Sequence, residues 1–158
     1  MFDVNEVVGE LQGLREEGYL SDALLRRAVR SIFSSEERFD WVGIYLLRSE
    51  DNALWLHNYL GDPTPHATIP VGEGVCGMAV ANNENINVPD VTQNDNYLSC
   101  SPKVKSEMVV LIRGNDQIFG QIDIDSHQDA AFTDEDLAAL EEVAGKLAEQ
   151  MVQEQTPP

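Results

Sequence analysis

The chain has 158 residues, a length typical of one domain, and 42% of them are hydrophobic, which is close to the average of globular proteins. No apolar run reaches the ~20 residues that a bilayer span needs, and the first residues lack the pattern of a secretory signal, so we expect a cytoplasmic protein without a membrane segment. With 28 acidic and 10 basic residues the net charge is −18, which argues against nucleic acid and anionic lipid as partners and fits either a solvated surface or adaptation to high salt.

Two helices are expected at the N-terminus. Apolar residues recur at helical spacing over residues 2–14, and again over a segment that begins near residue 21 and fades near Ser34 and Ser35. Ser21 or Asp22 can cap the second helix.

A hairpin is predicted next, with strands at about 41–47 and 54–60 around a polar turn. Trp41 and Tyr45 lie four residues apart in its first strand, so both side chains point to the same face. They are either ordinary core residues or the wall of a pocket that clasps a small apolar group.

A short strand at 67–71 leads into a glycine-rich turn and a short helix at about 75–81, and a brief strand is expected at 86–88. Cys76 falls in the first turn of that helix, where the helix dipole favours a thiolate.

Residues 89–105 have the polar composition of a loop, and this segment contains Cys100. A structural disulfide between Cys76 and Cys100 is not expected in a reducing compartment, so the two cysteines are either small buried residues or reactive thiols. The three histidines do not fall at ligand spacing and no Cys-x-x-Cys occurs, which predicts no metal site.

A second hairpin is predicted from strands at 108–113 and 118–125. Glu107 opens its first strand, and Asp123 and Asp125 end the second. These carboxylates either face water or converge on a pocket, where they could hold a cationic group or, with a raised pKa, donate a proton.

Thr133 and Asp136 predict the start of a final helix, followed by a frayed tail at 153–158. Together the elements predict one α/β domain of the α+β type over residues 1–158. Its N-terminal helices cover about 2–36, and its core, about 39–152, contains a mainly antiparallel sheet with helices packed against it.

Over about residues 39–147 the sequence resembles the free methionine-(R)-sulfoxide reductases, which are single-domain proteins of the GAF fold. The similar stretches are Trp41–Tyr45, Ile69–Gly77, Val88–Val91, Cys100, Ser106–Val110 and Asp123–Ser126. The resemblance implies thiol-dependent reduction of free methionine-(R)-sulfoxide to methionine, with no bound cofactor and with electrons from thioredoxin and NADPH or from a small thiol. It also implies roles for individual residues: Cys100 as the nucleophile, Glu107, Asp123 and Asp125 as ligands of the substrate's polar groups, and Trp41 and Tyr45 as the pocket lining.

One position departs from the family. His66 stands where these reductases often have the cysteine that resolves the oxidised nucleophile. Cys76 is then the remaining thiol of the chain that could form a disulfide with Cys100, for reduction by a thioredoxin-like partner. The alternative is a GAF module that binds or senses a small molecule without converting it. The sequence is compatible with either a monomer or a homodimer.

Overall fold

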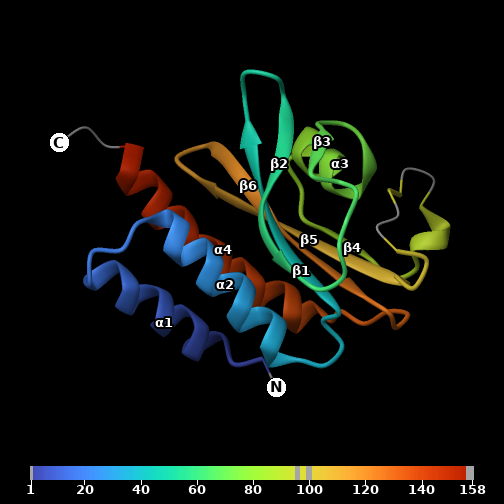
Figure 1. Cartoon of the computed structure of the whole chain (residues 1–158), viewed down its shortest axis with the longest axis horizontal. Coiled ribbons are helices and arrows are strands. Elements are labelled where there is room, and N and C mark those ends of the chain that lie inside the picture. The colour runs from blue at the N-terminus through green and yellow to red at the C-terminus, as the bar shows by residue number, and fades with distance from the viewer. Residues whose placement is uncertain (1, 95–96, 99–100, 156–158) are drawn as a thin grey trace.

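The computed structural model describes residues 2–94, 97–98 and 101–155, and its elements follow the predicted order (Figure 1). They are α1 (Val4–Glu16), α2 (Ser21–Ser35), β1 (Trp41–Arg48), β2 (Ala53–Leu60), β3 (Thr68–Pro70), α3 (Gly74–Asn82), β4 (Ile86–Val88), the 3-10 turn η1 (Val91–Gln93), β5 (Ser106–Gly114), β6 (Gln117–Ser126) and α4 (Asp134–Gln155). None of the described helices combines the length and the apolar character that a bilayer span requires.

The six strands form one sheet in the order β3-β2-β1-β6-β5-β4, and every neighbouring pair is antiparallel. Helices α2 and α4 cover one face of this sheet and α1 packs against these two helices, while α3 lies on the opposite face (Figure 1). The structure thus confirms the predicted α+β fold with an antiparallel sheet.

The central strands are buried on both faces, and each face has its own apolar cluster. Val42, Ile44, Ile122 and Ile124 pack against the helical layer of α1, α2 and α4. The residues that alternate with these along the strands, such as Tyr45, contribute to the cluster around α3. Because side chains alternate along a strand, this second face is where the predicted site residues lie.

Two local expectations were wrong. The N-cap of α2 is Leu20, which makes no side-chain capping bond. Ser21 instead donates its backbone N–H and its hydroxyl to Glu154 of α4, at 2.7 and 2.8 Å. For the same reason the predicted fraying does not begin at residue 153, since α4 remains helical to Gln155. Tertiary contacts between α2 and α4 override both local signals.

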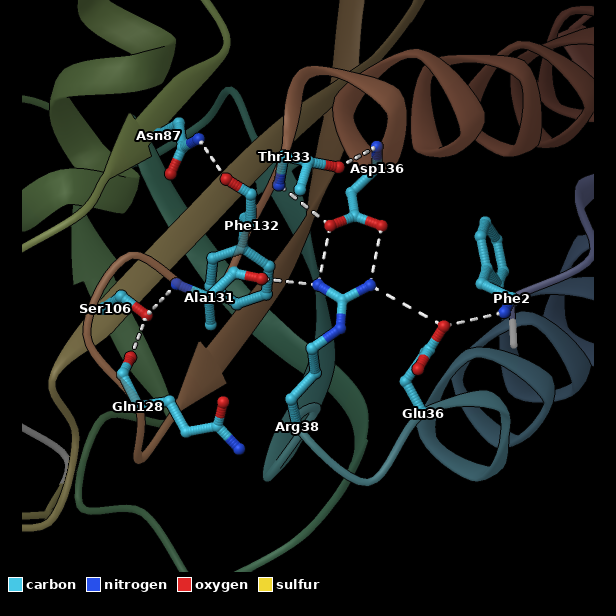
Figure 2. A network of polar contacts seen from close by, with 10 residues as sticks. All are labelled: Phe2, Glu36, Arg38, Asn87, Ser106, Gln128, Ala131, Phe132, Thr133 and Asp136. Atoms are coloured by element: carbon cyan, nitrogen blue, oxygen red, sulfur yellow. Dashed lines mark hydrogen bonds and ion pairs between the residues drawn. The ribbon is translucent and has the colours of Figure 1, made fainter.

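A polar network joins the start of α4 to the chain before β1 (Figure 2). Arg38 donates two hydrogen bonds to the carboxylate of Asp136, at 2.6 and 2.8 Å, and one to the carbonyl of Ala131. Thr133 and Asp136 exchange bonds between side chains and backbone amides, which confirms the predicted capping box. Although burial raises the pKa of Asp136, the hydrogen bonds from Arg38 hold it below its usual value.

The same network continues to the first residue of β5 (Figure 2). The hydroxyl of Ser106, which is fully buried, donates to the carbonyl of Gln128 at 2.6 Å and accepts from the amide of Ala131 at 3.3 Å. Ser106 directly precedes Glu107, so these contacts fix the position of Glu107 at the start of β5.

Candidate active site

Three carboxyl groups converge on the α3 face of the sheet. Glu107 of β5 lies directly opposite Asp125 of β6, and Asp123 lies two residues earlier in β6 on the same face. The three residues are 5%, 1% and 2% exposed, respectively. The structure therefore favours convergence on a site over exposure to water.

Burial sets the protonation of this cluster. It raises the pKa of Asp125 well above its usual value, and the charge of Asp123 raises it further. Burial also raises the pKa of Asp123, against the opposing effect of hydrogen bonds with Glu107 and Cys76. Directly opposite residues of an antiparallel pair have Cβ atoms ~5 Å apart, so Glu107 and Asp125 can bond to each other only when one of them holds a proton.

The Cys76 thiol belongs to the same cluster, in the first turn of α3 as predicted. It is 4% exposed and donates to Glu107 Oε2 at an S···O distance of 3.9 Å. Burial raises the pKa of Cys76 well above its usual value, and the charges of Asp123, Glu107 and Asp125 raise it further. The expectation that the helix dipole favours a thiolate here was therefore wrong, because burial and the acidic neighbours outweigh it.

Gln121 of β6 lies on the same face of the sheet as Asp123 and Asp125. Its amide Nε2 donates to the carbonyl of Cys76 at 3.0 Å, which ties α3 to the sheet. Its Oε1 is buried without a hydrogen-bond partner, as are Asp123 Oδ1 and both carboxyl oxygens of Asp125. Four buried acceptor atoms on one stretch of strand thus lack a donor among the described residues. Such atoms are costly unless a ligand, an ion or water satisfies them.

The aromatic residues of β1 lie on the same face as the acids. Trp41 pairs in register with Asp125, and Gly43 with Asp123. The indole of Trp41 lies across Gly43, stacks on Tyr59 with ring centroids 5.4 Å apart, and donates to the carbonyl of Asp62 at 3.0 Å. A residue with a Cβ at position 43 would collide with this ring.

Two clefts, each with about 250 Å³ of space that includes their open mouths, border the carboxyl cluster. The first is lined by Tyr45, His66, Ile69, Gly74, Val75, Cys76, Leu98, Glu107 and Asp123. The second is lined by Asp40, Trp41, Asp62, Pro63, Ser101, Val104, Asp125 and His127. Tyr45 and Trp41 are thus both core residues and cleft walls, one in each cleft.

Cys100 lies outside the described residues. Its described neighbours in the sequence, Leu98 and Ser101, line the first and the second cleft, respectively. His66, at the departure from the family pattern, borders the first cleft together with Cys76, and its carbonyl accepts from the Tyr45 hydroxyl at 2.8 Å.

Sequence reasoning missed three participants. Gln121 shares the alternation of Asp123 and Asp125, which could have placed it in the site. The role of Gly43 could not have been found, because it depends on the indole of Trp41 folding back along the strand. Asp40, which accepts from the backbone N–H of His127 at 2.7 Å in the second cleft, had no sequence signal.

Comparison with known proteins agrees with this geometry. Residues 22–151 match the model of the GAF domain. The free methionine-R-sulfoxide reductase of Escherichia coli is 40% identical over 108 residues, which are 68% of this chain and 64% of that protein. The alignment thus spans just under two thirds of the relative.

Two solved structures are also similar. The type II free methionine-R-sulfoxide reductase of Thermoplasma acidophilum is 35% identical, with a TM-score of 0.79 over 84% of this chain and 93% of that one. The free methionine-R-sulfoxide reductase of Neisseria meningitidis, in complex with its substrate, is 28% identical, with a TM-score of 0.86 over 94% of this chain and 88% of that one.

The buried acidic cluster against one face of the six-stranded antiparallel sheet, with α3 above it, is a candidate small-molecule site. The chain belongs to the GAF domain family and, within it, to the free methionine-R-sulfoxide reductases.

Proposed function

We propose that this chain reduces free methionine-(R)-sulfoxide to methionine, with Cys100 as the nucleophile. The observation that carries the proposal is the buried cluster of Glu107, Asp123 and Asp125 between two clefts with aromatic walls. The described residues on either side of Cys100 border these clefts, and relatives with the named activity share the fold.

The acids would serve the substrate in two ways. The α-ammonium group donates hydrogen bonds to a carboxylate of the cluster, and thereby gives donors to buried oxygens that have no partner among the described residues. A carboxyl group whose pKa is raised by burial, such as that of Asp125, is suited to donate its proton to the sulfoxide oxygen.

The chemistry would then proceed in three steps. The Cys100 thiolate attacks the sulfoxide sulfur while the carboxyl group protonates the oxygen, which yields methionine and a Cys100 sulfenic acid. The Cys76 thiol condenses with the sulfenic acid, so that a disulfide forms and water leaves. A thioredoxin-like dithiol, itself reduced by NADPH, or a small thiol then reduces the disulfide in a cytoplasmic setting.

The raised pKa of Cys76 has a kinetic consequence for this second step. Only the thiolate attacks at a useful rate, and a raised pKa confines the thiolate to alkaline solution. We therefore expect the rate of disulfide formation to increase with pH beyond the range of an ordinary thiol. If Cys76→Ser turned over at the wild-type rate with thioredoxin, an external thiol would be the resolving group instead.

The proposed binding of the ammonium group is tested by N-acetylation of the substrate. Acetylation removes the positive charge and should abolish turnover, whereas equal rates for both compounds would refute the proposal. Glu107→Gln should raise KM because it removes a charge-assisted hydrogen bond of about 1.5–3 kcal/mol. The matched control is Glu73→Gln, the same change at an exposed carboxylate beside the start of α3, which should leave KM unchanged.

A further inference from the structure

The strongest unassigned feature is a set of metal-ligating atoms within the site. Cys76 Sγ and one carboxylate oxygen each of Glu107 and Asp123 lie within 4.8 Å of one another, and all three residues are buried. They come from α3, β5 and β6, which explains why a search for closely spaced ligands in the sequence predicted no metal site.

One pair of the ligand atoms lies close to the separation that a small divalent ion requires. Zn²⁺ bonds of ~2.3 Å to sulfur and ~2.0 Å to oxygen, meeting at a tetrahedral angle, place the two ligand atoms ~3.5 Å apart. Cys76 Sγ and Glu107 Oε2 lie 3.9 Å apart, so a shift of a few tenths of an ångström would bring them to that separation.

Several buried carboxyl oxygens around these atoms also lack a partner in the described part of the chain. Asp123 Oδ1 and both carboxyl oxygens of Asp125 are buried without a hydrogen-bond partner, and each residue is no more than 2% exposed. Among the described residues, no Lys, Arg or His forms an ion pair with Asp123 or Asp125. A divalent ion would give these buried oxygens the partner that they lack.

The thiol distinguishes a metal ion from an ammonium group. Carboxylates serve either cation, but a thiol contributes as a ligand only when it loses its proton to a metal ion. One thiolate with two or three carboxylates is a set that favours borderline ions such as Zn²⁺ and Co²⁺ over Mg²⁺ and Ca²⁺, which prefer oxygen ligands alone.

We propose that Cys76, Glu107 and Asp123 form a binding site for a Zn²⁺-class divalent ion, with Asp125 beside its fourth position. The ion displaces the thiol proton to solvent and forms a metal–thiolate bond, with no change of oxidation state. An occupied site excludes an ammonium group from the same carboxylates and keeps Cys76 from forming a disulfide. The ion is therefore an inhibitor of a chain that performs the proposed reduction.

The test is Co²⁺ binding to the full chain carrying Cys100→Ser, in which Cys76 is the sole thiol. Titration should produce a thiolate-to-cobalt charge-transfer band in the near ultraviolet, with one ion bound per chain, and Zn²⁺ should displace the Co²⁺ and remove the band. Adding Cys76→Ser should abolish the band and weaken binding at least about 100-fold, since the loss of even an outer-shell partner costs 10–100-fold.

Two further variants separate this site from the acidic surface. Asp123→Asn should weaken binding, whereas Glu73→Gln, which alters an exposed carboxylate beside α3, should bind as the parent chain does. Absence of the charge-transfer band, or binding that survives Cys76→Ser, would overturn the proposal. Neither result bears on turnover of methionine sulfoxide, so the two proposals fail independently.

Discussion

Replacement of Gly43 by alanine tests how the aromatic wall of the site is built. Gly43 has no positive φ, so its backbone conformation accepts alanine. The obstacle is the indole of Trp41, because a Cβ at position 43 would lie 2.3 Å from Cη2 and 2.6 Å from Cζ3 of that ring, where ordinary contact begins at 3.4 Å. The ring must therefore move by about an ångström or more.

The indole has little freedom to move. It is 4% exposed, it stacks on Tyr59, and its N–H donates to the carbonyl of Asp62. Overpacking costs about 1–3 kcal/mol, the lost hydrogen bond about 1 kcal/mol and the disturbed ring pair about 0.5–1.5 kcal/mol. Because a partial shift keeps some of these contacts, we expect Gly43→Ala to lower the free energy of unfolding by about 2–4 kcal/mol.

The assay is urea unfolding followed by circular dichroism, arranged as a double-mutant cycle with Trp41→Leu. If the indole is the obstacle, Gly43→Ala should cost less than about 0.5 kcal/mol in the Trp41→Leu background. Gly145→Ala in α4, where an added Cβ meets nothing within 4 Å, is the control and should stabilise the chain by about 0.5–1 kcal/mol. An equal cost of Gly43→Ala in both backgrounds would show that the indole of Trp41 is not the obstacle.

Two further predictions concern pH. Asp125 has a raised pKa in the folded state, so the folded chain binds more protons than the unfolded chain at pH values between the two pKa values, and it loses stability as pH rises through this range. Asp125→Asn should therefore raise the melting temperature at pH 8 but not at pH 4, and an equal gain at both pH values would contradict this. Asp136 has a lowered pKa, so its contribution to folding stability is present at neutral pH and is lost on acidification. Asp136→Asn should lower the free energy of unfolding, measured with urea, by about 1–3 kcal/mol at pH 7 and by progressively less as pH falls through the acidic range. A loss independent of pH would count against the ion pair with Arg38.

The sequence was sufficient for the elements and for the face that carries the site. Alternation in the second hairpin placed Asp123 and Asp125 together, and the turn before α3 placed Cys76 in its first turn. The pairing of Glu107 with Asp125 required the strand register, which no local pattern contains.

The errors share one physical origin. The dipole argument for Cys76 considered α3 alone, whereas the pKa of the thiol is set by burial and by acids from β5 and β6. The capping argument for Ser21 likewise considered α2 alone, whereas Glu154 of α4 engages that residue. In both cases a partner distant in the sequence outweighs the local preference.

NADPH consumption by the chain with thioredoxin, thioredoxin reductase and free methionine-(R)-sulfoxide shows whether the chain is a reductase. We expect turnover of the R epimer, no turnover of the S epimer, and loss of activity in Cys100→Ser. Binding of the R epimer without NADPH consumption would rule out a reductase and indicate a GAF module that senses the molecule. Full activity in Cys100→Ser would exclude Cys100 as the nucleophile.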